Sequence, residues 1–325
     1  MTQSSLTPRI FRDAWDRHGG HAPTIAKQLG ISERTVFSWR NKTEAEIGSS
    51  LKTASGAERG RVPSNSYLQK VDIDGFSGRL VIFGDCHYWP GEKTLAHRAL
   101  VEVIKDIKPQ LIIANGDVFD GARVSRFPRN GWEEQPRMVD ELDEVKERMA
   151  EIRHAYRGAR FLRTIGNHDI RFDRYLATNA SEMEGINGAR LSDHLPEWRE
   201  CMLVGINGRA IVKHRFNGGA HAAYNNTIRA GTHIFTNHTH RLLTRPWGDY
   251  NGRRYSSECG TLAQVDGPQM AYAEGNPTDA CSGFMTAFFD KNGRLFYPTP
   301  CEVIDGQAVM ANQVVLSERK KAKAA

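Results

Sequence analysis

The chain has 325 residues, of which 39% are hydrophobic and 25% charged, and its formal net charge is +6. These values are typical of a globular protein with two domains, or of one large domain with an appendage, and they exclude a collagen, a coiled-coil rod and a wholly disordered chain. No apolar run approaches the roughly 20 residues that cross a bilayer, and the first residues lack the apolar core of a secretory signal. The five cysteines are scattered without a CxxC pattern, which favours a reducing compartment. We therefore expect a cytoplasmic protein with no membrane partner.

The first predicted unit is a small all-α domain over residues 1–41. Within residues 22–41, Gly30 separates two amphipathic stretches and Ser32 can cap the second of them, while residues 10–15 belong to a third amphipathic segment. This spacing predicts a helix-turn-helix. The block resembles the homeodomain-like helix-turn-helix modules of phage and bacterial DNA-binding proteins.

If this domain binds DNA, the second helix of its motif enters the major groove. The outward side chains of that helix are candidate DNA contacts, namely Ser32, Arg34, Thr35, Ser38 and Arg40. Residues 1–65 hold ten Lys or Arg against six Asp or Glu, and residues 318–325 hold four against one, so positive charge gathers at both ends. We expect attraction to nucleic acid, and to DNA in particular, to reside in these ends. The alternative is that the helical block binds another protein.

The rest of the chain is predicted to consist of a linker, one large domain and a short tail. Residues 42–66 lose hydrophobic periodicity and are rich in Ser, Gly and charge, which predicts a flexible linker. A single domain is predicted over residues 67–317, followed by a basic tail at 318–325. Strands are expected at 80–83, 111–114 and 161–165, helices near 92–107, 133–157 and 170–177, and β-rich structure after residue 200 with Asn-Gly turns at 207, 251 and 292. This alternation predicts an α/β domain in which helices cover a sheet.

Five clusters of metal-binding residue types follow one another in this domain. The first three come directly after apolar strands, at the carboxyl ends where open α/β sheets bind their ligands. The clusters are Asp85 with His87, Asp117 with Asp120, Asn167 with His168 and Asp169, His214 alone, and His238 with His240. Mixed nitrogen and oxygen donors favour Mn²⁺, Fe or Zn²⁺ over Mg²⁺ or Ca²⁺. Seven donors are too many for one tetrahedral ion and suit two ions that share a carboxylate.

The ordered motifs DxH, GDxxD, GNHD, a later histidine and a final HxH resemble those of the calcineurin-like metallophosphoesterase superfamily, over about residues 79–242. The resemblance implies a four-layer α/β/β/α sandwich and two divalent transition-metal ions, for which we expect manganese, with iron or zinc as alternatives. It implies one ion held by Asp85, His87 and His240 and a second held by Asn167, His214 and His238, with Asp117 bridging both. His168 is then a catalytic residue at the phosphate or the leaving oxygen, Asp169 holds its imidazole, and Asp120 orients a ligand from behind.

Departures from the superfamily pattern bear on the substrate. Asn237 replaces the usual glycine of the last motif, and Arg215 replaces the glycine that usually follows His214. Gly121 stands where Ser/Thr protein phosphatases have an arginine, so the motif argues against that activity. The loop at 122–130 is most similar to those of uncharacterised phage and prophage phosphoesterases. Candidate phosphate-binding residues in or beside the motifs are Arg123, Arg126, Arg129 and Arg171.

These features predict a dinuclear metal-dependent phosphodiesterase, a nuclease tethered to DNA, that hydrolyses its ester by attack of a metal-bound hydroxide. For a phage-encoded protein, the expected compartment is the cytoplasm of the bacterial host. Two alternatives remain open. One is a phosphomonoesterase or small-nucleotide phosphodiesterase, and the other is a DNA-binding regulator whose phosphoesterase body is an inactive scaffold.

Overall fold

The computed structural model describes residues 6–18, 20–47, 51, 70–127, 131, 133 and 135–318. The chain divides into two compact units, Met1–Ser66 and Tyr67–Ala325, and each is described by itself. Most of the expected linker, and all of the expected basic tail except Glu318, lie outside the described residues.

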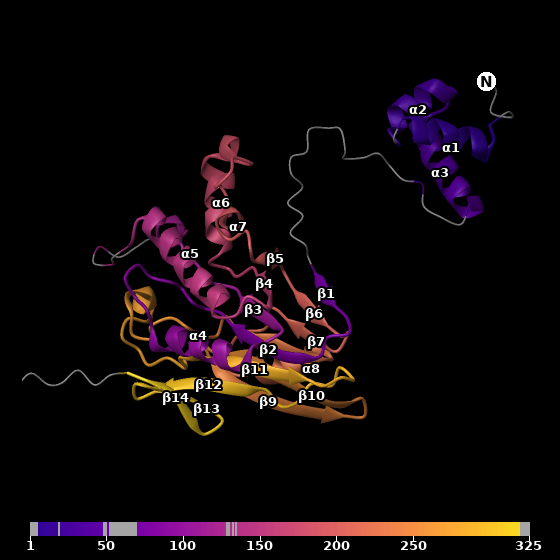
Figure 1. Cartoon of the computed structure of the whole chain (residues 1–325). Coiled ribbons are helices and arrows are strands. Elements are labelled where there is room, and N and C mark those ends of the chain that lie inside the picture. Colours follow the sequence, from indigo (N-terminus) through magenta and orange to yellow (C-terminus); the bar gives the residue numbers. More distant parts are fainter. Residues whose placement is uncertain are drawn as a thin grey trace, which may run out of the picture. The chain divides into compact units, whose positions relative to one another are not determined.

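Three helices make up the described part of the first unit: α1 (Pro8–Arg17), α2 (Ala22–Leu29) and α3 (Glu33–Ile47) (Figure 1). Their apolar faces share one small core, whose buried members include Phe11, Trp15, Ile25, Leu29 and Val36. Gly30 ends α2 in the left-handed conformation, at φ 65°. The Ser32 hydroxyl accepts a hydrogen bond from the backbone N–H of Thr35, as expected of the residue that caps α3.

Helix α3 ends at Ile47, six residues beyond the expected boundary at residue 41. The side chain of Thr43 is fully buried, so the helix keeps one face on the core through this stretch. Leu51 packs in the same core, and its backbone N–H donates to Glu44 Oε1 at 2.9 Å. The expectation that a flexible linker begins at residue 42 is therefore corrected. Contact with the core keeps residues 42–47 helical although their composition is polar.

The second unit contains two β-sheets. The strands expected from the three apolar runs lie side by side and parallel in the larger sheet, as β2 (Gly78–Phe83), β3 (Leu111–Asn115) and β4 (Arg160–Thr164). This sheet has eight strands in the order β14-β13-β12-β11-β2-β3-β4-β5. Its other members are β5 (Arg199–Cys201), β11 (Gly283–Phe289), β12 (Thr299–Ile304), β13 (Gln307–Met310) and β14 (Gln313–Ser317).

The smaller sheet has six strands in the order β1-β6-β7-β8-β10-β9. They are β1 (Val71–Ile73), β6 (Val204–Ile206), β7 (Ala210–Val212), β8 (His233–Thr236), β9 (Leu242–Asp249) and β10 (Gly252–Cys259). Each predicted Asn-Gly turn lies at a reversal between antiparallel segments. The first joins β6 to β7, the second joins β9 to β10, and the third lies between Phe289 and Leu295.

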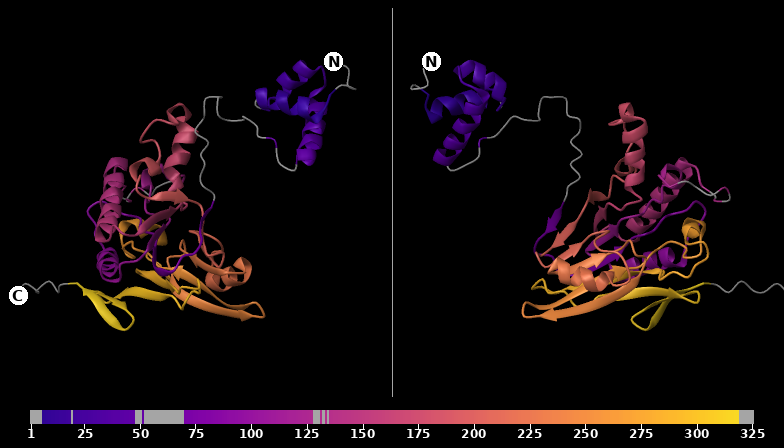
Figure 2. Two further views of the ribbon diagram at one scale, coloured as in Figure 1. Left: turned by 45° about the vertical axis from the view of Figure 1, so that its right-hand side comes forward. Right: turned by 180° about the vertical axis from the view of Figure 1, so that it is seen from behind.

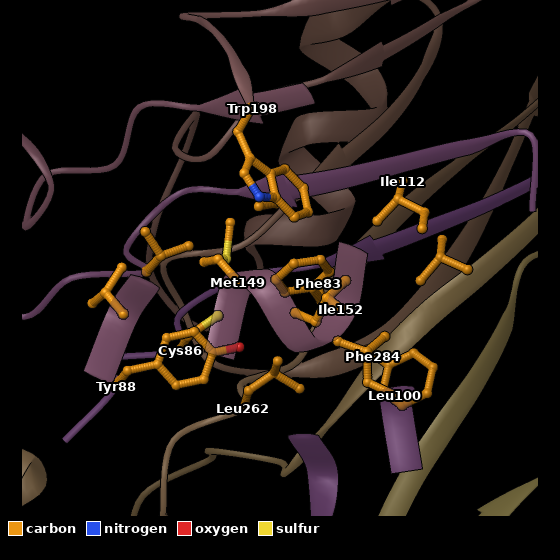
Figure 3. Packing of buried hydrophobic residues seen from close by; sticks show 14 of the residues in the cluster. Phe83, Cys86, Tyr88, Leu100, Ile112, Met149, Ile152, Trp198, Leu262 and Phe284 are labelled. Carbon is orange, nitrogen blue, oxygen red and sulfur yellow. The ribbon is translucent and has the colours of Figure 1, made fainter. Parts of the chain in front are cut away.

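The unit has four layers, and its two large hydrophobic cores lie on the two faces of the larger sheet. Helices α4 (Leu95–Ile107) and α5 (Met138–Ala155) cover the larger sheet over one core, which includes Phe83, Cys86, Leu100, Ile112 and Met149 (Figure 3). A second core fills the space between the sheets and includes Leu80, Ile82, Val212, Phe235 and Phe289. Helix α8 (Ala222–Ala230) packs on the smaller sheet. The order of helix, sheet, sheet and helix is the predicted α/β/β/α sandwich (Figure 1 and Figure 2).

The parallel strands determine where the residue clusters meet. Because β2, β3 and β4 run in one direction, their carboxyl ends lie at the same edge of the sheet, and the first three clusters follow them there. Two more helices, α6 (Ile170–Asn179) and α7 (Leu191–His194), come after β4. Helix α5 begins at Met138, five residues after the start near residue 133 that was expected from the sequence. No helix in the described part of the chain is long and apolar enough to cross a membrane.

Candidate metal centre and active site

The candidate ligand residues form two neighbouring groups at this edge of the sheet. Ligand atoms of Asp85, His87 and His240 lie within 4.8 Å of one another, and so do those of Asp117, His214 and His238. The Asn167 side-chain oxygen lies 3.2 Å from His214 Nε2, beside the second group. The first group contains the three residues expected for one ion, and the second contains two of the three expected for the other ion together with Asp117, the expected bridge. A third group, His87, Asp120 and His168, shares His87 with the first.

The backbone at these residues adopts a conformation that L-residues rarely use. Asp85, His87, Asp117, His238 and His240 all have positive φ, between 40° and 74°. A non-glycine residue in this region costs on the order of 1–3 kcal/mol and persists only where its surroundings enforce it. The strained turns aim the donor side chains from separate loops toward common points.

Glycines of the motifs leave space for neighbouring donors. A Cβ atom on Gly166 would lie 2.0 Å from Asp117 Oδ1, and one on Gly116 would lie 2.5 Å from His214 Nδ1. At Gly116, where φ is 81°, the glycine also permits the turn, whereas at Gly166, where φ is not positive, close packing alone excludes a side chain.

The donor atoms fit divalent metal ions. Asp85 Oδ1 and His87 Nε2 are buried and have no hydrogen-bond partner among the described residues. A buried carboxylate oxygen or imidazole nitrogen without a partner is costly, and a coordinated cation would satisfy both atoms. A mixture of imidazole, carboxylate and amide donors is the chemistry of a divalent transition-metal site.

Hydrogen bonds behind the rings direct the imidazole nitrogens. His87 Nδ1 lies 2.9 Å from Asp120 Oδ1, and His214 Nδ1 lies 2.8 Å from the Asn115 carbonyl oxygen. If each Nδ1–H donates to its oxygen, each Nε2 points into the centre, which is the usual arrangement behind a metal-binding histidine. Asp120 therefore orients a ligand residue, as expected.

Burial and neighbouring charges shift the pKa values of the site residues when no metal is bound. Burial raises the pKa of Asp85. Burial opposes the charged form of His214, but the charge of Asp117, whose Oδ2 lies 3.0 Å from Nε2, outweighs it and raises the pKa of His214 to about 10. The same pair keeps the pKa of Asp117 far below its usual value in spite of burial. Burial lowers the pKa of His238 to about 4 and that of His240 to about 3, so both rings are neutral at pH 7.

We expect metal binding to release protons, because His214 must lose its Nε2 proton before it can bind a cation. With a pKa of about 10, this ring carries that proton at pH 7. The apparent dissociation constant for Mn²⁺ should fall by up to about tenfold per pH unit between pH 7 and 9. Calorimetric titration at pH 7, in two buffers of different ionisation enthalpy, should count about one proton or more released. The same binding enthalpy in both buffers would contradict the expectation.

The metal-free fold should respond to pH in a related way. His214 binds its proton more tightly in the folded chain than in the unfolded chain, where its pKa is near 6.5. This group therefore stabilises the metal-free fold below about pH 6.5, and the contribution is lost as the pH rises toward 10.

His168 is the remaining histidine of the site, and it lies beside the donors with both ring nitrogens engaged. Its Nδ1 lies 2.9 Å from Asp120 Oδ1, and its Nε2 lies 3.1 Å from Arg171 Nη2. If Nδ1–H donates to the carboxylate, Nε2 is the nitrogen that can accept or give a proton. One carboxylate thus fixes the rings of both His87 and His168.

The structure corrects the role expected of Asp169, because its carboxylate does not contact the His168 ring. The carboxylate is fully buried and accepts hydrogen bonds from four backbone N–H groups of the metal-site loops. The donors are Asp117, Val118, Phe119 and Gly166. Arg163 Nη1 lies 3.4 Å from Asp169 Oδ2. Asp169 therefore braces two loops, and Asp120 has the orienting role that the sequence suggested for Asp169.

A pocket of about 600 Å³ opens beside the donors. Its polar lining includes His87, His168, Arg171, Glu133 and Glu274, and its apolar lining includes Trp89, Phe127 and Met270. Of the candidate phosphate-binding arginines in the described part of the chain, Arg171 alone lines it. The Arg123 guanidinium donates to the Gln135 carbonyl, and that of Arg126 lies over the Phe127 ring. Arg129 lies outside the described residues.

The candidate DNA contacts lie on α3 or at its start, and three of them have side-chain partners within the unit. The hydroxyl oxygens of Ser32 and Thr35 lie 2.8 Å apart and are hydrogen-bonded to each other. Arg40 donates to Glu44 at 2.9 Å, and its guanidinium lies 5.4 Å from the centre of the Trp15 ring. Arg34 and Ser38, which are one helical turn apart, are exposed.

Sequence reasoning missed a buried amide pair that joins the two sheets. Asn115 Nδ2 donates to Asn237 Oδ1 at 2.8 Å, and Asn237 Nδ2 donates to the Gly260 carbonyl. Thr164 donates its hydroxyl hydrogen to Asn115 Oδ1. The replacement of the usual glycine by Asn237 was the available signal. The asparagine side chain fastens the last motif to β3, and the turn itself is made by the positive φ of His238.

A four-layer sandwich with two adjacent groups of nitrogen and oxygen donors at the ends of its parallel strands is the architecture of a metal-dependent phosphoric ester hydrolase. The family model of calcineurin-like phosphoesterases matches residues 78–261, more than half of the chain, and the chain belongs to this family. Because the chain is a hydrolase of this family, the alternative of an inactive scaffold is set aside.

Two phage proteins are similar over most of their length. The Gene 54 protein of Mycobacterium phage D29 is 27% identical over 241 residues, which cover 66% of this chain and 91% of that protein. The Gene 54 protein of Mycobacterium phage L5 is 27% identical over 255 residues, covering 71% and 96%. Among solved structures, Vps29 of Entamoeba histolytica complexed with zinc matches with 13% identity and a TM-score of 0.39, over 73% of this chain and 99% of that one. An archaeal phosphodiesterase matches with 14% identity and a TM-score of 0.33, over 69% and 99%.

Proposed function

We propose that the chain is a manganese-dependent phosphodiesterase that cleaves nucleic acid in the cytoplasm of the phage host, and that its helical first unit holds it on DNA. The observation that carries the proposal is the chemistry of the pocket beside the donors. Its lining has a single arginine, Arg171, and apolar surface from Trp89, Phe127 and Met270. A phosphodiester has one negative charge and organic groups on both sides, whereas a monoester carries nearly two charges at pH 7. One cation next to apolar surface suits the diester.

In the proposed centre, Asp85, His87 and His240 would hold one ion, and Asn167, His214 and His238 the other, with Asp117 shared. When bound, two such ions would neutralise phosphate charge and lower the pKa of the attacking water. Arg171 would contact a non-bridging phosphate oxygen. His168 would hold or give a proton at Nε2 beside the leaving oxygen, while its Nδ1–H stays on Asp120.

The proposed DNA tether rests on the exposed face of α3. Arg34 and Ser38 lie on that face, and Phe37 beside them is 52% exposed. A binding module joined to an enzyme raises the local concentration of substrate without changing the chemistry at the active site.

The test is a turnover screen of the full chain with Mn²⁺ on single-stranded DNA, duplex DNA, RNA, bis(p-nitrophenyl) phosphate and p-nitrophenyl phosphate. We expect cleavage of at least one nucleic acid and of the aryl diester, both lost on chelation and restored by Mn²⁺. Turnover of the aryl monoester with intact nucleic acid would contradict the proposal and favour a phosphomonoesterase.

The tether has its own control within the same screen. Arg34→Glu should raise the KM for DNA and leave kcat/KM for the aryl diester unchanged, because that small substrate needs no tether. A variant that cleaves DNA with wild-type KM would show that α3 does not hold the substrate.

A further inference from the structure

We propose that the catalytic unit carries a second nucleic-acid contact, a surface on α8 and the β9–β10 hairpin that holds single-stranded substrate next to the metal centre. We call it the α8 platform and define it by Lys213, Phe216, Tyr224, Arg229, Arg245 and Trp247. The inference rests on the proposed function in one respect, namely that the substrate is a nucleic acid.

The charge of the chain is concentrated in this part of the second unit. Residues 213–254 contain seven Lys or Arg and one Asp, a net charge of +6 that equals the formal charge of the whole chain. Arg254 pairs with Asp249, and Arg241 pairs with Asp279. Lys213, Arg229 and Arg245 have no carboxylate within 4.0 Å in the described part of the second unit. This segment, and not only the ends of the chain, therefore attracts polyanions.

Aromatic rings alternate with these cations. Phe216 is 36% exposed, and its ring centre lies 5.6 Å from Lys213 Nζ and 5.4 Å from Arg229 Cζ. Tyr224 is also 36% exposed, stands edge-on to Trp247 with ring centres 5.5 Å apart, and has Arg245 Cζ 5.2 Å from its own centre. Proteins that bind single strands without sequence preference use cations to contact the phosphates and aromatic rings to stack on the bases.

These side chains share one face of the unit. Helix α8 buries Ala222, Ala223, Asn226 and Thr227, which leaves Tyr224 and Arg229 on its outer side. Arg245 and Trp247 are two residues apart on β9, so they point to the same face of the sheet, and both meet Tyr224 there. Figure 2 shows α8 lying over these strands.

The platform begins at the metal centre. Lys213 directly precedes the candidate ligand His214, and Phe216 follows it by two residues. On the other side, Arg241 follows His240 and donates from Nη1 to the Gly219 carbonyl at 2.7 Å, which ties the loop before α8 to the last motif. A strand lying on the platform would thus deliver a phosphate to the donors. The pocket on the His168 side would hold the scissile diester beside Arg171. Because its lining also includes Glu133 and Glu274, the neighbouring phosphates of the strand would meet their cations on the platform instead.

The test measures binding without cleavage. The full chain, in an Arg34→Glu background that weakens the proposed tether, is titrated in EDTA against a fluorescent oligothymidylate by anisotropy at several salt concentrations. The double variant Arg229→Gln/Arg245→Gln should bind at least about tenfold more weakly, with the salt slope reduced by about 0.7 for each phosphate that no longer meets an arginine. Tyr224→Ala should weaken binding about tenfold with the salt slope unchanged, since it removes stacking and no charge. Arg174→Gln, an exposed arginine on α6, is the matched control and should bind as the parent does.

The outcomes separate the platform from the proposed function. Wild-type affinity and slope in the double variant would overturn the platform, even if the enzyme cleaves DNA. Loss of binding in the double variant, with no nucleic acid cleaved by the wild-type enzyme, would support the platform and contradict the proposed function. Equal affinity for a duplex of the same length, equally weakened by Tyr224→Ala, would overturn the choice of a single strand.

Discussion

Replacing Asp117 by asparagine is expected to lower kcat/KM for diester hydrolysis by at least about a thousandfold, a loss of roughly 4 kcal/mol of transition-state stabilisation. The exchange preserves shape and removes the negative charge that holds His214 at 3.0 Å. Its other oxygen accepts the backbone N–H of His168 at 2.7 Å, so the exchange also disturbs the loop that carries the proton donor. Steady-state rates on the aryl diester, together with metal content measured by atomic emission, test this directly.

Asp74→Asn is the matched control for that variant, because Asp74 is an exposed acid in the same unit. It should retain wild-type activity and metal content. If Asp117→Asn retained more than a tenth of wild-type activity with two metals bound, the assignment of Asp117 as the shared ligand residue would be wrong.

Replacing Asp169 by asparagine is expected to destabilise the fold by about 2–3 kcal/mol, because buried Arg163 loses one of its two carboxylate partners and keeps only Glu200. Backbone donors of two loops would also lose a charged acceptor. Urea unfolding of the metal-free protein should show a lower midpoint with an unchanged slope.

The same variant distinguishes a structural role of Asp169 in the loops from the role of holding the His168 ring. If Asp169 only braces the loops, the fraction that remains folded and loaded with metal should keep the wild-type shape of its pH–rate profile. A displaced limb of that profile, with wild-type stability, would restore the role that the sequence suggested. Asp106→Asn, an exposed change on α4, should alter neither stability nor the profile.

The alternation of strands and helices predicted an α/β domain with its donors at one edge of the sheet, whereas the four-layer sandwich was expected from the resemblance of the motifs to a known superfamily. Apolar runs define β2, β3 and β4, and parallel strands bring their following residues to one edge, whatever the loops do. The roles of Asp120 and Asp169 could not be separated in this way. Asp169 is next to His168 in the sequence, and Asp120 belongs to another motif of the same site. Only the folded path of the loops shows that the Asp120 carboxylate, and not that of Asp169, contacts the His168 ring.

Other features depend on contacts between distant segments. The last turns of α3 look like linker because their composition is polar, and a single buried side chain, Thr43, together with Leu51, keeps them on the core. The α8 platform was hidden by counting charge over 252 residues between the two ends, where acids on other elements cancel it. A count over residues 213–254 alone gives +6, but only the folded chain shows that Lys213, Arg229 and Arg245 lie against exposed aromatic rings.

The Asp120 carboxylate contacts the rings of both His87 and His168, so it couples a candidate metal ligand to the candidate proton donor. The carboxylate cannot shift toward one ring without lengthening its contact with the other, because both Nδ1 atoms lie 2.9 Å from the same Oδ1. A cation bound by His87 and a substrate oxygen bound beside His168 would therefore not bind independently of each other. Asp120 is the position at which a single substitution would disturb both halves of the site at once.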